Sequence, residues 1–307
     1  MIPVAFLASL ILFLLLKLTP GDPVLIMLGE RVTTQNYEAV RRDLGLDQPY
    51  PIQYLRWVGH IVQGDLGKSL RNGSPVKDEI VERLPATFQL GLIALGIGLC
   101  IALPLGILSA VFRRSFLGVG STGFTQVGIA LPQFFIGLLL LYFVAYRLRW
   151  VPPGGYTAFV ENPGEWLKRI ILPALTLSFF PAATQTRFIR SGLLDTLHQD
   201  YIRTARAKGF AESTVILRHA LRNALIPSVT LLGIQVGLIL EGAFIVEFVF
   251  GWPGVGRLAV QALGARDYPI VQAVVILTVF VVLLANLVVD IAYAYLDPRI
   301  SYTRKSA

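Results

Sequence analysis

The sequence predicts an all-α, polytopic membrane protein with six transmembrane helices. Of its 307 residues, 54% are hydrophobic and only 15% are charged, whereas a soluble domain carries about 25% charged residues. A soluble globule of this size could not hide so many apolar side chains from water. In addition, six windows reach or approach the roughly 20 apolar residues that a helix needs to cross a bilayer.

The predicted spans differ in strength. The second is the clearest, because residues 88–112 contain no charged side chain. The first is the shortest. The sequence that follows it, from Thr19 to Pro23, lacks the small-residue pattern of a signal-peptide cleavage site, so we interpret it as an uncleaved span. The six windows are residues 2–18, 88–112, 123–146, 170–190, 225–248 and 270–293.

Lys and Arg residues in the short loops predict the orientation, because cytoplasmic loops carry the excess of these residues. Twelve of them fall on one side, seven of those between Arg187 and Arg222, against six on the other. Both termini are therefore predicted to be cytoplasmic. The predicted parts of the chain are a first transmembrane helix (1–18), an extracytoplasmic helical segment (19–87), a five-helix transmembrane core (88–300) with a cytoplasmic loop at 191–226, and a cytoplasmic tail (301–307).

The extracytoplasmic segment is long and polar enough to form helices of its own. Thr34 is a candidate cap for a helix that ends near Gly45, and Pro51 opens a second helix in which apolar residues share one face. A third helix is predicted to begin at Pro75 and to stop at Pro85, just before the second span. We expect these helices to lie against the outer face of the membrane. The apolar face of the second helix comprises Ile52, Leu55, Val58 and Val62.

The chain shows no pattern of a catalytic, cofactor-binding or metal site. Gly67, Lys68 and Ser69 resemble the end of a phosphate-binding loop, but that pattern needs glycine at position 62, where the chain has valine. We expect a helix-capping turn there instead. The three histidines lie far apart, and the one cysteine excludes a disulfide framework. Because the basic residues flank hydrophobic runs and form no single stripe, no nucleic acid partner is expected.

A few polar residues lie inside the predicted spans. Glu241 lies about 24 Å from the inner end of its span, near the outer rim of a core of about 30 Å, so a proton relay at mid-membrane is not indicated. Neutral polar side chains could line a wet pathway or hydrogen-bond between helices, and we favour helix contact for each one taken singly. Gln126 and Gln133, seven residues apart, would share a face. The candidate pathway residues are Gln126, Gln133, Gln185, Gln235 and Glu241.

The cytoplasmic loop between the fourth and fifth spans has the pattern of a helix, a glycine stop and a second helix. Ala205 and Ala207 are small enough for a partner surface to approach the backbone, and Gly209 can adopt the left-handed conformation that ends a helix. From the residues alone, this loop is either a knob that a partner protein grips or a basic segment that only anchors the topology.

The same loop resembles the coupling loop of permease subunits in ATP-binding-cassette importers, in particular the first permease of the dipeptide, oligopeptide and nickel branch. The resemblance covers nearly the whole chain. It departs from importer permeases at large at Arg203, Thr204 and Arg222, which we interpret as features of the branch. The motifs that carry it are LTPGDP at 18–23, LGLDQP at 44–49, GDLG at 64–67, RLPAT at 83–87, FGWPGVGR at 250–257, RDYP at 266–269 and LDPRI at 296–300.

The resemblance implies a type I importer permease fold in the cytoplasmic membrane of a bacterium or archaeon. It implies membrane lipid around the chain and three kinds of protein partner: a second, homologous permease, two ATPase subunits and an extracytoplasmic substrate-binding protein. ATP and Mg would be used by the ATPase subunits, and this chain would bind no cofactor and catalyse no reaction. The residues implied to couple to the ATPases are Tyr201, Ile202, Arg203, Thr204, Ala205, Arg206, Ala207, Lys208 and Gly209.

The resemblance also assigns an outer loop to the binding protein. Its glycines allow a tight projecting turn, and we expect Trp252 to form a rigid, exposed tip. The residues of this loop are Trp252, Pro253, Gly254, Gly256 and Arg257.

The implied function is import of peptides or similar small solutes through a pathway between two permeases. Peptides are the commonest cargo of the branch, and the sequence does not separate them from glutathione, nickel chelates or haem. Two alternatives stay open: a secondary transporter or channel, and a membrane assembly factor without a pathway.

Overall fold

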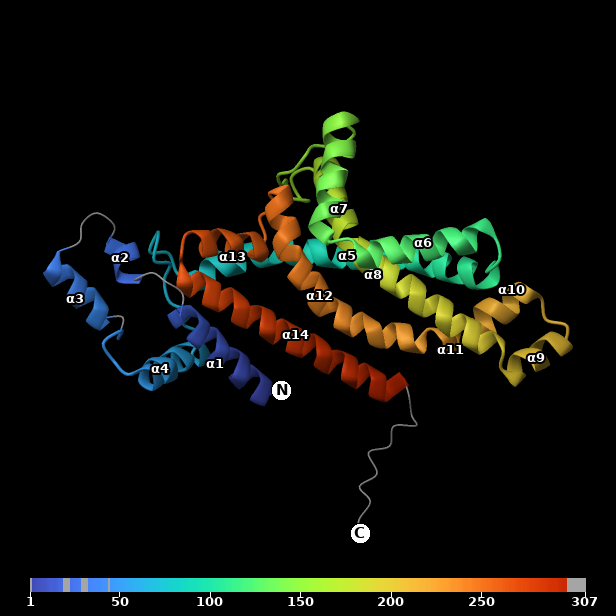
Figure 1. Ribbon diagram of the computed structural model, residues 1–307, viewed down its shortest axis with the longest axis horizontal. Coiled ribbons are helices and arrows are strands. Elements are labelled where there is room, and N and C mark those ends of the chain that lie inside the picture. The colour runs from blue at the N-terminus through green and yellow to red at the C-terminus, as the bar shows by residue number, and fades with distance from the viewer. Residues whose placement is uncertain (1, 19–22, 29–32, 44, 297–307) are drawn as a thin grey trace, which may run out of the picture.

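The structure is a computed structural model that describes residues 2–18, 23–28, 33–43 and 45–296. These residues form helices joined by loops, and no strand occurs among them. Figure 1 shows an elongated molecule with α2, α3 and α4 near one end of its long axis and α9 and α10 at the other. The first helices are α1 (Ile2–Leu18), α2 (Pro23–Leu28), α3 (Thr34–Asp43), α4 (Tyr50–Val62) and α5 (Val76–Val111).

The remaining helices make up the rest of the bundle. Two short π-helical segments, η1 and η2, interrupt the α-helical run. In chain order the elements are α6 (Phe116–Ala130), α7 (Gln133–Leu140), η1 (Leu141–Arg147), α8 (Pro163–Leu197), α9 (Asp200–Ala207), α10 (Glu212–Thr214), η2 (Val215–Ala220), α11 (Leu221–Ala224), α12 (Ile226–Phe250), α13 (Val255–Gly264) and α14 (Tyr268–Leu296).

Several helices are long and apolar enough to cross a membrane. Among the described residues these are α5, α12 and α14 up to Val288, and α6 with α7 and η1 would be a fourth if the bent pair forms one span. The apolar stretch of α1, Pro3–Leu15, is shorter. The chain is therefore an all-α integral membrane protein with three or four candidate spans, and six spans remain a prediction.

The expectation that a helix stops at Pro85 is wrong. The helix that begins at Val76 continues through Pro85 and through the second predicted span to Val111. Proline removes one backbone donor, but neighbouring elements can hold such a helix together. Here the indole Nε1 of Trp252 donates a hydrogen bond of 2.9 Å to the carbonyl oxygen of Ala86, directly after the proline.

The third predicted span, 123–146, is not one straight helix. It is broken between α6 and α7 at Leu131 and Pro132, and the two helices are bent by 109° (Figure 1). Leu131 has an extended backbone (ψ 133°), the conformation that a following proline favours. Because the break lies between Gln126 and Gln133, these two residues do not share a helix face as the sequence predicted.

The helix α8 is the centre of the packing, since it contacts α5, α6, α7, α11 and α12. Glycines let α5 approach it closely. A Cβ atom at Gly106 would lie 2.7 Å from Ile189 Cγ2, and one at Gly98 would lie 3.3 Å from Pro181 Cβ. Small residues at helix contacts are typical of membrane proteins, where close backbone approach replaces the hydrophobic effect as the source of attraction.

The predicted apolar face of α4 turns away from the rest of the chain. Ile52, Leu55 and Val62 are exposed, whereas Gln53 and Tyr54 are buried. Tyr54 makes an edge contact with Phe13 of α1, with ring centroids 5.6 Å apart. The polar and aromatic residues therefore attach α4 to α1, and the apolar residues are left on the surface.

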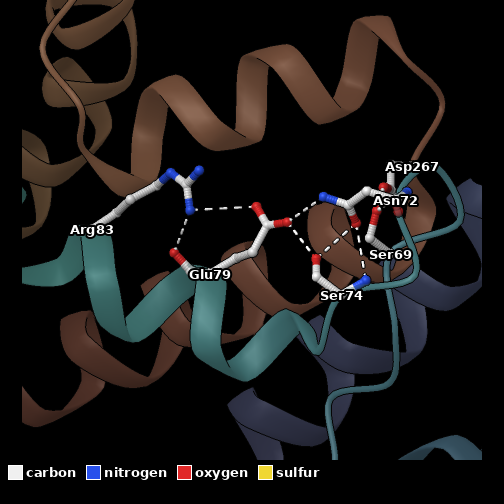
Figure 2. Close-up of polar contacts among 6 residues, drawn as sticks. All are labelled: Ser69, Asn72, Ser74, Glu79, Arg83 and Asp267. Carbon is white, nitrogen blue, oxygen red and sulfur yellow. Dashed lines mark hydrogen bonds and ion pairs between the residues drawn. The ribbon is translucent and has the colours of Figure 1, made fainter.

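The sequence Gly67, Lys68, Ser69 forms a turn before α5, and the predicted helix cap is borne out only in the backbone: the N–H of Val76, the first residue of α5, donates to the carbonyl oxygen of Gly67 (3.0 Å), whereas no side chain caps the helix. Ser69 Oγ donates to Asp267 Oδ2 and accepts from the backbone N–H of Asn72 (3.3 Å). The second carboxylate oxygen of Asp267 accepts from the backbone N–H of Leu70 (3.1 Å). This turn joins the segment before α5 to the connection between α13 and α14 (Figure 2).

The start of α5 is held by the same region. Glu79 Oε1 accepts a hydrogen bond from Asn72 Nδ2 (2.8 Å) and lies 2.6 Å from Ser74 Oγ. Its other oxygen lies 3.3 Å from Arg83 one turn further along the helix (Figure 2). An acidic residue in the first turn also interacts favourably with the helix dipole, so the polar network stabilises the start of the longest helix.

Candidate functional site

The helix α9 is anchored to the bundle through one face. Ile202 is fully buried and Ala205 is 7% exposed, and both belong to an apolar cluster with residues of α5, α8, η2 and α11. The members of this cluster from those elements are Ala110, Leu193, Val215, Ile216, Ala220 and Ala224. The expectation that a partner surface reaches Ala205 is wrong, because Ala205 lies three residues after Ile202 and so on the same, buried face.

The opposite face of α9 is open. Tyr201 is 42% exposed, and the two basic residues Arg203 and Lys208 are exposed as well. Phe210, just beyond the helix, adds a large apolar side chain that is 47% exposed. Sequence reasoning did not include Phe210. Its position directly after the glycine stop was the available signal. The remaining exposed members of the predicted set are Thr204, Arg206, Ala207 and Gly209.

Gly209 ends the helix as predicted. Its φ of +81° is left-handed, a conformation that costs other residues about 1–2 kcal/mol. Arg206 then bridges the turn, because its Nε and Nη2 atoms donate to the two carboxylate oxygens of Glu212 at 3.1 and 2.6 Å. These hydrogen bonds hold the pKa of Glu212 below its ordinary value. The turn therefore has a fixed geometry, and Glu212 is a partner that the sequence motif did not indicate.

The charges on α9 are not equally available. Arg206 is paired with Glu212, and Arg203 lies 3.1 Å from Asp200. Lys208 has no side-chain hydrogen bond or ion pair within the described parts of the chain. Lys208, which lies between Tyr201 and Phe210 in the sequence, is therefore the basic residue of this segment that is free to meet another protein.

The expectation of an exposed Trp252 tip is wrong. Trp252 is fully buried, donates its indole N–H to Ala86, and meets the ring of Tyr156 edge-on at 4.9 Å. Gly254 and Gly256 are also buried, against Glu247 and Phe244 respectively. The loop is folded back onto the bundle because its small residues permit close contact. Pro253 and Arg257 keep partial exposure.

Glu247 organises this outer loop. Its side chain is fully buried, and its two oxygens accept hydrogen bonds from Thr87 Oγ1 (2.6 Å) and the backbone N–H of Arg257 (3.1 Å). Thr87 Oγ1 in turn accepts from the backbone N–H of Val255 (2.8 Å). One carboxylate therefore joins α5, α12 and the start of α13. The sequence signal was a carboxylate in an apolar helix shortly before a glycine-rich turn.

The candidate pathway residues separate into two groups. Gln185 and Gln235 are fully buried between α8 and α12, with Gln185 Nε2 donating to Gln235 Oε1 at 3.0 Å. Their side chains hydrogen-bond between helices, which is the role that we favoured for such residues. Gln133 is half-buried and lies against Gly242, whereas Gln126 and Glu241 are exposed.

Comparison with known proteins identifies the family. Residues 102–302 match the family described as "Binding-protein-dependent transport system inner membrane component". Residues 1–91 match the family that describes the N-terminal part of such membrane components. The chain belongs to this family of transport permeases. As the membrane component, the permease is not the ATPase of such a system, which is a separate subunit. Membership disfavours both alternatives, a secondary transporter or channel and an assembly factor.

Relatives of the permease align over nearly its whole length. The oligopeptide transport system permease protein AppB of Bacillus subtilis is 40% identical over 304 residues, which cover 98% of this chain and 96% of AppB. The glutathione transport system permease protein GsiC of Escherichia coli is 41% identical over 302 residues, with 98% and 96% coverage. A putative peptide permease of Brucella suis is 43% identical, with 96% and 94% coverage.

Solved structures resemble the permease in fold. A chain from an inward-facing conformation of the MetNI methionine ABC transporter has a TM-score of 0.59 and 18% identity, covering 71% of the permease and 96% of that chain. A chain from an amino acid ABC transporter has a TM-score of 0.52 and 16% identity, with 71% and 94% coverage. The predicted ABC importer permease fold is therefore confirmed at the level of the fold.

Proposed function

We propose that this permease is one of two homologous membrane subunits that form the import pathway for peptides in the cytoplasmic membrane of a bacterium or archaeon. The names of its relatives support this cargo, since AppB belongs to an oligopeptide system and GsiC to a system for glutathione, itself a small peptide. The proposal includes six spans, both termini in the cytoplasm, residues 19–87 outside, two ATPase subunits that use ATP and Mg, and an extracytoplasmic binding protein.

The observation that carries the proposal is the two-faced geometry of α9. An exposed face at one end of the molecule is available to an ATPase subunit, and the buried Ile202 connects that face to Leu193 of α8 and Ala224 of α11. A displacement of α9 therefore has to move these helices or break the apolar cluster. ATP can switch access to the pathway only if it favours one arrangement of the permease. Rigid attachment of α9 would transmit that preference to α12 through the segment that ends at Pro227.

In this proposal only part of the predicted outer loop contacts the binding protein. Trp252 fixes the loop to the bundle, and the partly exposed Pro253 and Arg257 are the residues of the predicted set that can meet the binding protein. Gly254 and Gly256 contribute by allowing the loop to pack closely.

The test is reconstitution of the complete complex, with the variants Gly209→Val and Arg206→Ala. Valine is strained at the left-handed φ of Gly209, and the Arg206 change removes both hydrogen bonds to Glu212. We expect both variants to insert into the membrane, and we expect stimulation of the ATPase by the loaded binding protein to fall about tenfold. Gly264→Ala, with no atom within 4 Å of the added Cβ, is the matched control. Full stimulation in the double variant, or uphill uptake without ATP, would contradict the proposal.

A further inference from the structure

The helix α12 has two distinct faces. One face is buried against α5, α7, α8, α13 and α14, and includes Ile239, Ala243 and Val246. The other face is exposed, with residues three or four positions apart and therefore in line along the helix. We call it the Glu241 stripe. It consists of Ile234, Leu238, Glu241, Ile245 and Phe248.

Glu241 is the one charged residue of this stripe. It lies nine residues before the end of the helix at Phe250, or about 14 Å along its axis. Its carboxylate makes no hydrogen bond or ion pair with any residue that the structure describes. Glu247, six residues later, is fully buried and hydrogen-bonded to Thr87. Of the two carboxylates of α12, Glu247 is therefore buried and hydrogen-bonded, and only Glu241 is exposed and free to meet a group outside the chain.

A lipid-facing position does not suit Glu241. Ionisable residues in spanning helices generally face other helices or a water-filled cavity, because hydrocarbon does not solvate their charge. The exposed side of α14 shows a contrast in charge, since up to Val288 its exposed residues are the apolar Phe280, Leu284, Leu287 and Val288 and the neutral Asn286. The Glu241 stripe therefore faces an aqueous space or another protein chain in the assembled transporter, and the α14 surface faces lipid.

We infer that the Glu241 carboxylate lies on the translocation pathway and contacts the ammonium group of the passing cargo. This inference rests on the proposed function. A peptide carries an α-ammonium that is mostly protonated at neutral pH, the charge that complements a free carboxylate. A bound metal ion is a poorer match, because no group of three His, Cys, Asp or Glu residues gathers anywhere in the described part of the chain. The apolar residues above and below Glu241 would meet cargo side chains without selecting among them.

Cysteine labelling tests the environment of the stripe. The chain has one cysteine, Cys100, which a Cys100→Ser background removes. In the complete complex in proteoliposomes, Ile245→Cys places a thiol one turn from Glu241, and Leu284→Cys on α14 is the control. The probes are a trimethylammonium and a sulfonate methanethiosulfonate reagent. We expect the thiol at position 245 to react and the one at position 284 not to react. We expect the cation-to-anion rate ratio at 245 to fall about tenfold with Glu241→Gln, since the probes differ by two charge units at about 6 Å.

Uptake tests the contact with cargo. We expect Glu241→Gln to lower the uptake of a free peptide about tenfold per ATP hydrolysed, and to leave the uptake of its N-acetylated form unchanged at equal occupancy of the binding protein. Glu241→Asp keeps the charge and is expected to retain at least half of the wild-type uptake. An unreactive thiol at position 245, or equal effects on both peptides, overturns the inference. Loss of assembly with the second permease in Glu241→Gln alone also overturns it, because Glu241 would then pair with that subunit. Absence of uptake by the wild-type complex would contradict the proposed function instead.

Discussion

The outer loop provides the sharpest test of the packing, through the substitution Gly254→Ala. Gly254 is buried over the carboxyl group of Glu247, and a Cβ atom there would overlap the carboxyl carbon and both oxygens. The φ of Gly254 is −95°, which alanine adopts without strain. The effect of the substitution therefore comes from the lack of space alone.

The expected loss of stability follows from the contacts of that carboxylate. To make room for a methyl group, Glu247 has to leave Thr87 Oγ1 and the backbone N–H of Arg257. A buried polar group that loses its hydrogen-bond partner costs about 1–3 kcal/mol, and alanine lowers the entropy of the unfolded chain by the equivalent of about 0.4–1 kcal/mol. With both hydrogen bonds lost, the free energy of unfolding should fall by about 1–5 kcal/mol.

The assay is denaturant unfolding of the purified permease in detergent, with Gly264→Ala as the matched control. Gly264 is the last residue of α13, and an added Cβ there meets no atom within 4 Å. We expect this control to be neutral or to stabilise the protein by up to about 1 kcal/mol. Equal unfolding free energies for Gly254→Ala and the wild type would refute the role that we assign to Glu247, because the buried carboxylate would then have room to adapt.

Two further predictions concern the attachment of α9. Ile202→Ala removes three carbons from a fully buried site and should loosen α9 by about 2–5 kcal/mol, which we expect to lower uptake per ATP hydrolysed, whereas Leu263→Ala at a 60% exposed site should not. The pair of Arg206 and Glu212 stabilises the turn above the ordinary Glu212 pKa of about 4.5, and this contribution is lost as the pH falls through the lowered pKa of the folded state. Because the pair is exposed, we expect its contribution to the stability of the turn, measured by hydrogen exchange of the backbone amides, to be at most about 1 kcal/mol. The same measurement on Glu212→Gln should show no such pH dependence.

Local rules predicted those features that depend on one residue and its neighbours. Gly209 takes the predicted left-handed conformation because this residue has no side chain to oppose it. The helical character of the apolar windows depends only on their length and composition. The same rules predicted the exposed helix α9, apart from the direction in which Ala205 points.

Local sequence rules do not predict which prolines break a helix. Pro132 follows an extended residue and coincides with a break of 109°, whereas Pro85, Pro104 and Pro181 lie inside continuous helices. The local cost of proline is similar at each position. The outcome depends on whether neighbouring helices hold the chain in line, and that information is in the tertiary packing. The buried state of Trp252 has the same origin, since the acceptor of its N–H lies on α5, far away in the sequence.

The two carboxylates of α12 differ in their surroundings. Glu241 and Glu247 have the same chemistry and lie on one helix, and a separation of six residues places them about 120° apart around its axis. Packing against α5 gives Glu247 a hydroxyl partner, and no described element covers Glu241. Residue type alone would assign them one role. Their surroundings give one a part in the structure of the outer loop and leave the other as a free charge, so the rotation of α12 within the bundle decides which carboxylate is open to a group outside the chain.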